Sequence, residues 1–491
     1  MQTKSIVRTF ETFEDALDFY KRNQHLSVAQ LEPVLSQLAF IQAGAKSKTG
    51  EVLFVDERFI QLLLQVTFDM ERSDSASLTR YAQAVSKLSV PRGGSVELNE
   101  LARKIAEVSV QRVNAFSPNA LSQLAFGLGS RGVSDPQFVD FIRMESLKMI
   151  QDFSPESAIM MLEAFRRMGV FNRELADNLV ERLTDEVDRF TSRDISNCVS
   201  VMVKLGLGRG YLLRRLSRLS FENLDLFTTP QLVKLFSGYA KLRFITTAGV
   251  EEMLSTIDSR GLDELSPSQA AELVFATAMS GYTGESHIAT KLVDIVSETP
   301  EEISITNLVD ATWALCLMDN QEALKPLVVR IFAIPPPSNR QLLLKTLEIS
   351  NALKIEFPKA AGKDLVSAQW WSAMEDAEKM EVNRFESSRL HSEILALIES
   401  IKPSGPLSKK LAIQRAAQVG CYRCDFYDEA HKLIVDIDTL SRPTTLTLKH
   451  RHLAAQGFKV VSLGYWDVRR FKTLEEQQEW LRILIHKALR R

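Results

Sequence analysis

Four side chains near the C-terminus have the types needed for phosphodiester hydrolysis. Asp425, Asp436 and Asp438 are carboxylates that can hold Mg²⁺. Lys449 could orient a water molecule, but the spacing is loose and this lysine lies in a segment expected to be helical. The competing interpretation is that the acids are structural, pairing for example with Arg442. We favour the structural interpretation and expect no catalytic residue.

Other motifs that could carry chemistry are weak. Cys421 and Cys424 have the spacing of half a zinc site, but no second pair and no histidine couple lies at ligand spacing, so a chance pair is favoured. The chain has four cysteines, too few for a disulfide scaffold. It has no phosphate-binding glycine loop of the Walker type and no nucleophile elbow. We expect no metal and no cofactor.

Positive charge is concentrated at the C-terminus. The whole chain carries a net charge of −2, but residues 440–491 hold eleven Lys or Arg against four Asp or Glu. Basic side chains beside aromatic ones suit single-stranded or looped RNA, through phosphate contacts and base stacking. The alternative is a solvated basic face with a core tryptophan. The candidate RNA-binding residues here are Lys449, Arg451, Trp466, Arg469, Arg470 and Lys472.

A repeated phrase organises most of the chain. Six copies follow one another at spacings of 37 or 38 residues, and weaker copies can be aligned upstream near residues 32–40 and 75–88 and downstream near 340–354. The anchors of the six copies are Phe116, Phe153, Phe190, Phe227, Leu265 and Ile303.

Each copy predicts a helix with defined ends. Ser or Thr follows the anchor as an N-cap, and apolar residues five, eight and twelve positions on form one helix face. The eleventh position is small or narrow, which lets a neighbouring helix approach closely. Glycine at the sixteenth position ends four of the helices: Gly132, Gly169, Gly206 and Gly281. A second helix follows, so the units must stack on one another as an α-solenoid.

Basic residues also recur within the repeats. Arg167, Lys204 and Lys241 lie fourteen residues after their anchors, and Arg214 and Arg215 belong to a dense cluster after the third copy. These five residues could contact phosphates. The first three, which we call the basic column, could also be ordinary exposed positions on a polar stripe of the helices, because acids such as Glu163 interrupt this stripe. The cluster could instead pair with acidic helices.

The periodicity changes after the breaker Lys402–Pro406. Residues 422–428 and 431–438 are expected to form strands, 446–457 a helix, 458–464 a strand and 474–489 a final helix. The predicted fold is mostly α, an α-solenoid followed by a small α/β domain. The predicted parts are an N-terminal extension (1–25), the solenoid (26–360), a helical linker (361–415) and the α/β domain (416–491).

The C-terminal segment resembles the RAP domain. The matching residues, in order, are Asp425, Ile434 to Asp438, Lys449, Leu453, Gly457-Phe458, Val460-Val461 and Tyr465-Trp466. The sequence departs from the family at Thr439, where the family has glycine, and in having no histidine between Asp438 and His450, where the family has one shortly after the second acid. The resemblance implies a restriction-endonuclease-like fold. RAP domains follow helical repeats of similar length in organellar RNA-processing and ribosome-associated proteins, including relatives with FAST-kinase domains.

These observations lead to a functional hypothesis. We expect a non-enzymatic, mitochondrial RNA-binding protein, either a ribosome component or an assembly factor, whose partners are ribosomal RNA or organellar transcripts and other proteins of a ribonucleoprotein complex. No membrane partner is expected, because no apolar window of about 18 residues occurs. The alternatives are a scaffold that holds peptide segments and a metal-dependent RNase.

Overall fold

The computed structural model describes most of the 491 residues. The described ranges are 9–23, 25–44, 53–90, 94–170, 172–207, 210–282, 287–358, 365–382, 389–407, 409–438, 443–464, 471 and 473–490. The chain forms two compact units, Met1–Phe227 and Thr228–Arg491, each built around its own helices.

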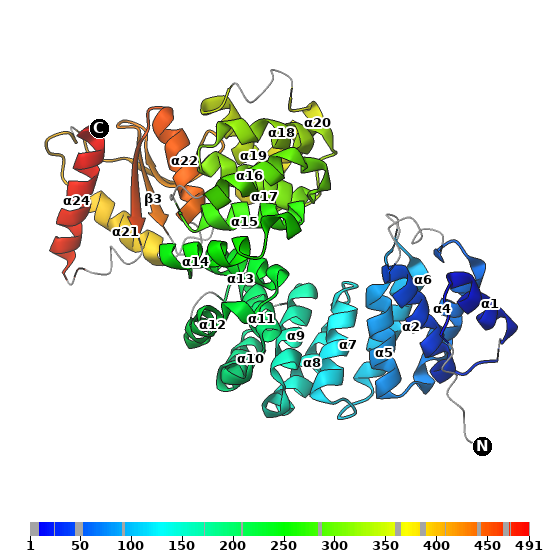
Figure 1. Cartoon of the computed structure of the whole chain (residues 1–491). Coiled ribbons are helices and arrows are strands. Elements are labelled where there is room, and N and C mark those ends of the chain that lie inside the picture. The colour runs from blue at the N-terminus through cyan, green and yellow to red at the C-terminus, as the bar shows by residue number, and fades with distance from the viewer. Residues whose placement is uncertain are drawn as a thin grey trace. The chain divides into compact units, whose positions relative to one another are not determined.

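The first unit consists of two rows of stacked helices (Figure 1). In one row, each helix packs on the next in the order α2 (Val28–Gly44), α5 (Ser75–Lys87), α7 (Pro118–Gly129), α9 (Pro155–Arg167) and α11 (Ser192–Leu205). The second row follows in the order α4 (Glu57–Asp69), α6 (Val96–Val110), α8 (Pro136–Lys148), α10 (Arg173–Glu186) and α12 (Tyr211–Glu222). Helix α1 (Phe13–Arg22) packs on α2 and α4.

The second unit continues the same pattern. Its first row is α13 (Thr229–Leu242), α15 (Pro267–Met279), α17 (Ile305–Leu317) and α19 (Arg340–Ile355). Its second row is α14 (Thr247–Asp258), α16 (His287–Glu298) and α18 (Gln321–Ala333). Short 3-10 helices precede the anchors of five repeats: η2 (Ile150–Asp152), η3 (Val187–Arg189), η4 (Leu224–Leu226), η5 (Leu262–Glu264) and η6 (Pro300–Glu302).

The repeat prediction is confirmed at the level of individual side chains. The predicted N-caps precede the six first helices: Ser117, Ser154, Thr191, Thr228, Ser266 and Ser304. The positions five, eight and twelve residues after each anchor are buried in all six copies. The neighbouring helix approaches closely at the eleventh position, as expected: a Cβ atom on Gly127 would lie 2.5 Å from the backbone oxygen of Ala82.

The sixteenth position adopts positive φ in all six copies. The four predicted glycines have φ between 67° and 72°. The other two copies place Arg243 (φ 53°) and Asp319 (φ 59°) at the same position. The helix ending is therefore imposed by the repeat geometry, and glycine only reduces its steric cost.

Gly169 allows a test of this helix ending. Gly169→Val is expected to lower the free energy of unfolding by about 1 kcal/mol or more, because a β-branched residue resists positive φ. No neighbouring atom lies within 4 Å of the Cβ position, so backbone strain is the only cause. Gly169→Asn is the control, since asparagine tolerates this conformation. Equal melting temperatures for the valine and asparagine variants would contradict the assignment.

The C-terminal domain contains a sheet of four strands. The strand order is β1 (Ile413–Val419), β2 (Tyr422–Asp428), β3 (Leu433–Asp438) and β4 (Lys459–Gly464), with β3 and β4 parallel and the other pairs antiparallel. Helix α22 (Pro443–Ala455) connects β3 to β4, and α24 (Leu474–Arg490) ends the domain. The small α/β domain is thus confirmed, and β1 is an additional strand.

Helices cover both sides of this sheet (Figure 1). One apolar cluster joins α21 (Arg389–Ser400) and α24 to residues such as Phe426, Val435 and Leu463. A smaller cluster joins Leu453 of α22 to Ile434 and its neighbours. Within the segment 361–415, α20 (Ala368–Val382) packs on α19, whereas α21 contributes to the core of the C-terminal domain. No helix among the described residues is long and apolar enough to span a bilayer.

Candidate functional site

The basic column in the first unit is organised around an acid. Glu163 Oε1 lies 3.1 Å from Arg167 Nε and 3.3 Å from Lys204 Nζ. Arg166 adds two hydrogen bonds of 2.8 Å to the same carboxylate. Glu163, which was expected to interrupt the stripe, therefore holds three cations together, and the cluster keeps a net positive charge.

Arg167 is held in a fixed position but stays accessible. Its guanidinium carbon lies 4.3 Å from the centroid of the Phe126 ring, and Nη1 donates to Ser130 Oγ at 2.8 Å. The side chain is nevertheless 35% exposed. A stacked, positioned guanidinium with an open edge is well suited to a phosphate contact.

The ionisation of Glu163 should stabilise the fold at neutral pH. Burial raises its pKa, but the hydrogen bond from Arg166 and the charge of Lys204 outweigh burial and hold the pKa at about 2. A carboxyl with a lowered pKa stabilises the fold above its unfolded pKa, and this contribution is lost as the pH falls through the folded value.

Glu163→Gln tests this contribution. We expect the variant to be less stable at neutral pH and to show a smaller loss of stability than the unmodified chain as the pH falls from about 4.5 toward 2. The measurement is chemical denaturation at a series of pH values. Parallel stability curves for the two proteins would contradict the assignment.

The other predicted basic residues of the repeats have different environments. Lys241 Nζ lies 5.2 Å from the centroid of the Phe275 ring in the second unit. Arg215 donates to Asp188 and lies over the ring of Tyr211. Arg214 is exposed and forms no ion pair with another described residue. These side chains do not form one cluster within either unit.

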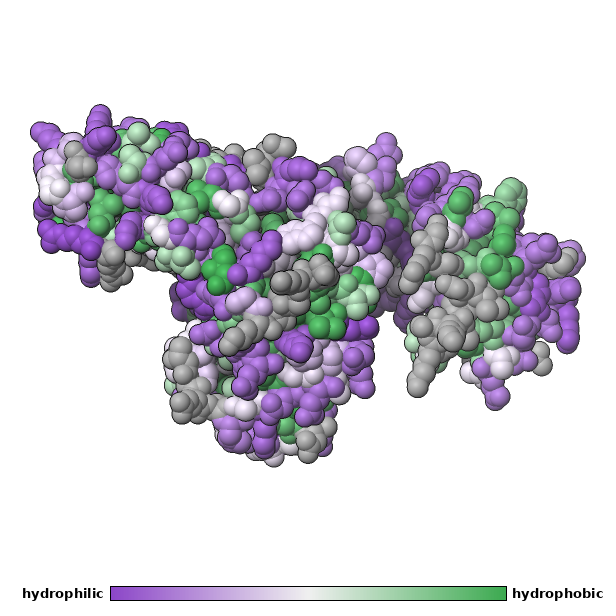
Figure 2. Space-filling model, turned by 90° about the horizontal axis from the view of Figure 1, so that it is seen from above, coloured by the Kyte–Doolittle hydropathy of each residue, from purple (hydrophilic) through white to green (hydrophobic). Residues whose placement is uncertain are grey.

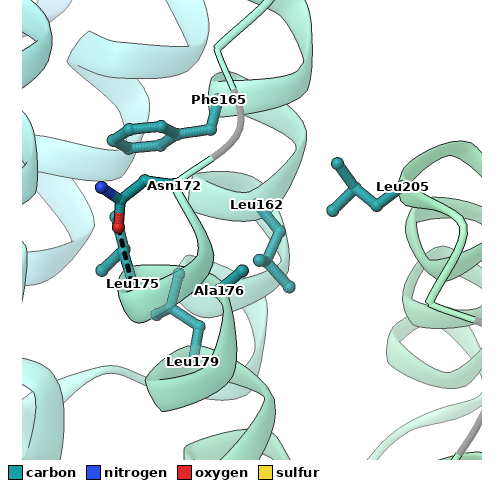
Figure 3. A pocket seen from close by; sticks show the side chains of 7 residues that line it. All are labelled: Leu162, Phe165, Asn172, Leu175, Ala176, Leu179 and Leu205. Carbon is teal, nitrogen blue, oxygen red and sulfur yellow. Dashed lines mark hydrogen bonds between the residues drawn. The ribbon is translucent and has the colours of Figure 1, made fainter. Parts of the chain in front are cut away.

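A small apolar pocket lies between α9 and α10 (Figure 3). Leu162, Leu175 and Leu179 line it, and Leu205 faces it from the end of α11. Its volume of about 10 Å³ leaves room for no more than one water molecule. The pocket is a packing gap and not a ligand site.

The acids and the lysine of the C-terminal domain form a buried network. Asp436 is fully buried, and its Oδ2 lies 2.7 Å from Lys449 Nζ and 2.9 Å from His450 Nε2. Its Oδ1 accepts a hydrogen bond of 3.0 Å from the backbone N–H of Asp425. Burial raises the pKa of Asp436, but the bonds to His450 and Lys449 outweigh this effect and lower it.

The remaining groups of the network also have internal partners. Asp425 accepts a hydrogen bond of 2.7 Å from the backbone N–H of Ile437, and its other oxygen lies 3.5 Å from His391 Nε2. Lys449 donates to the backbone oxygen of Arg423 at 2.6 Å. The network ties β2 and β3 to α22, so its geometry supports a structural role for these acids. The side chain of Asp438 lies outside the described residues.

Arg451 joins the C-terminal domain to the end of the repeat array. Its guanidinium binds both oxygens of Glu356, the residue after α19. It also donates to the backbone oxygens of Cys316 and Leu317, each at 2.9 Å. These carbonyls belong to the last turn of α17, where no further helical turn follows to supply donors; Cys316 O also accepts from the backbone N–H groups just after the helix. One arginine thus satisfies a helix end and a carboxylate across the junction.

The sequence of this chain matches models of known protein families. Residues 423–483, which contain Asp425, Asp436, Lys449 and Arg451, match the model of the RAP domain. The C-terminal domain is a RAP domain. Residues 65–282 of the repeat region match the model of the RNA-editing substrate-binding complex 6 protein. No curated protein matches this chain.

The whole chain is therefore a helical-repeat protein with a C-terminal RAP domain. Both matching families support an RNA-binding role.

The predicted RNA-binding residues of the RAP domain fall into two groups. Lys449 is 8% exposed and Arg451 is half-buried, and the contacts described above engage the charged groups of both. The other four lie outside the described residues: Trp466, Arg469, Arg470 and Lys472. Whether these four contact RNA stays a prediction.

Sequence reasoning missed three features of the site. The role of Glu163 in holding three cations together could not be predicted, because a charge pattern does not show which acidic side chain lies beside which basic side chain. The contacts of Arg451 join residues 95 and 135 positions apart, and no local pattern reports such a contact. The third feature is a basic face on α24, whose i, i+4, i+8 spacing (Arg482, His486 and Arg490) was visible in the sequence.

Proposed function

We propose that this protein is an RNA-binding subunit of a mitochondrial ribonucleoprotein complex. The observation that carries the proposal is the pairing of a RAP domain with a repeat region that matches an RNA-editing complex family. Arg451 supports it further, because its bonds fix the RAP domain against the last repeats and so allow the two to act as one binding element.

Local basic clusters in a nearly neutral chain suit such a subunit. The net charge of −2 provides little general attraction to RNA, so binding must depend on positioned cations such as Arg167 and Lys204. The remaining, mixed surface is available for protein partners. This balance is what we expect of a component that binds RNA at a few places and proteins elsewhere.

Two settings are proposed for this activity. The first is the mitochondrial ribosome, where the chain would contact ribosomal RNA as a component or an assembly factor; the organellar, ribosome-associated members of the RAP family support it. The second is a complex that binds transcripts for editing or processing, and the family match over residues 65–282 favours it.

We also propose that the RAP domain is not a nuclease. The oxygens of Asp436 and Asp425 already accept hydrogen bonds from two backbone N–H groups and lie beside Lys449, His450 and His391, which leaves them poorly placed to hold Mg²⁺. The assay is incubation of the purified chain with organellar RNA in Mg²⁺ or Mn²⁺, beside an Asp438→Asn variant. Cleavage that disappears in the variant would overturn this part of the proposal.

Crosslinking the protein to RNA in cells and sequencing the attached fragments tests the two settings. Fragments concentrated in mitochondrial ribosomal RNA would support the first setting, and fragments spread over mitochondrial messenger or guide transcripts would support the second. Recovery of no RNA above the level of an uncrosslinked control would contradict the proposed function and would favour a peptide-binding scaffold.

A further inference from the structure

The last helix of the RAP domain carries a groove of unusual composition. Five residues of α24 line it: Arg482, Ile483, His486, Lys487 and Arg490. Residues 480–490 contain no acid. Leu481 and Ile485 on the opposite side of α24 are fully buried in the domain core, so the groove residues project away from the sheet. We call these five residues the α24 groove.

A second basic segment lies against this helix. Residues 402–411 contain three exposed lysines, Lys402, Lys409 and Lys410, and no acid. Ser404 Oγ lies 3.4 Å from His486 Nε2, and Leu407 and Leu411 share the apolar core with α24. In Figure 2, the surface of the RAP domain carries many hydrophilic residues, with hydrophobic ones among them.

The cations of the α24 groove differ in their availability. Arg482 forms an ion pair with Glu479, just outside the groove. Lys487 and Arg490 are exposed and form no ion pair with another described residue. Beyond the effect of burial, the charges of Arg482 and Arg490 lower the pKa of His486, which indicates a positive potential in the groove.

We propose that the α24 groove binds the backbone of single-stranded RNA, which extends the proposed function to a defined surface. Arg482, His486 and Arg490 follow one another at intervals of four residues, or about 6 Å along the helix. A flexible strand can place successive phosphates beside such a row, and the exposed side chain of Ile483 can contact a base face. The absence of acids from both basic segments favours a polyanion over a protein of mixed charge.

The test is a pair of substitutions in the full chain. Lys487→Gln with Arg490→Gln removes the two unpaired cations of the groove, and both side chains are exposed, so the melting temperature should not change. The control is Lys291→Gln with Lys325→Gln, two exposed lysines on α16 and α18 of the same unit. The probe is a short fluorescent poly(U) strand, titrated at several salt concentrations.

We expect the groove variant to bind poly(U) more weakly and its slope of log K against log salt to be shallower by about 1.4, since each lost contact with single-stranded RNA removes about 0.7. The control variant should match the unmodified chain. Equal slopes for the groove and control variants would overturn this inference alone, whereas failure of the unmodified chain to bind would overturn the proposed function as well. Binding to anionic lipid vesicles but not to poly(U) would assign the groove to membranes and would also overturn the inference.

Discussion

Asp436→Asn is expected to destabilise the RAP domain strongly, by about 3 kcal/mol or more, because it leaves a buried lysine without its counter-charge. Lys449 is 8% exposed, and its ammonium group would keep only the backbone oxygen of Arg423. Asparagine preserves the shape of the side chain and an acceptor for the N–H of Asp425. The expected loss of stability therefore measures the effect of removing the negative charge of Asp436. Denaturant unfolding of the RAP domain provides the measurement.

A double variant separates the charge from other effects of this substitution. Adding Lys449→Met to Asp436→Asn removes the unpaired ammonium group, so part of the lost stability should return. If the double variant is as unstable as the sum of the two single variants, Asp436 and Lys449 are not coupled. That outcome would contradict the buried network.

Gly127→Ala should destabilise the repeat array, although the same substitution usually stabilises a helix by about 1 kcal/mol. The new methyl carbon would lie 2.5 Å from the backbone oxygen of Ala82, so α7 and α5 would have to move apart. Overpacking of this kind costs roughly 1–3 kcal/mol. The sign of the change is thus diagnostic, and thermal unfolding measures it.

Gly44→Ala is the matched control for this substitution. Gly44 is the last residue of α2, and no atom lies within 4 Å of its Cβ position. We expect this variant to be as stable as the unmodified chain or slightly more stable. A stabilising effect of alanine at both glycines would show that α5 and α7 do not approach closely at Gly127.

The repeat array could be predicted from the sequence because its signals are local and recur. Each helix start needs a capping side chain, and each buried face needs apolar residues at fixed spacing, so six copies reinforce one another. The positive φ at Arg243 and Asp319 could not be predicted in this way, because residues other than glycine mostly adopt negative φ and the repeat register imposes the conformation here.

The C-terminal domain was predictable in outline but not in its contacts. Strand β2 alternates buried and half-buried side chains, whereas β1 has the sequence IQRAAQV, which lacks the β-branched pattern of a strand. Strand β1 forms because it pairs with the edge of β2, and a pattern within residues 413–419 does not report a partner outside them. The hydrogen bonds of Arg451 could not be predicted for the same reason, since they depend on the packing of α22 against the repeat array.

The measurement that tests the central claim most directly is the affinity of the purified full chain for RNA as a function of salt. We expect single-stranded RNA to bind more tightly than duplex RNA of the same length, and log K to fall linearly with log salt. An affinity that does not change with salt, or no binding to either RNA at low salt, would contradict the account.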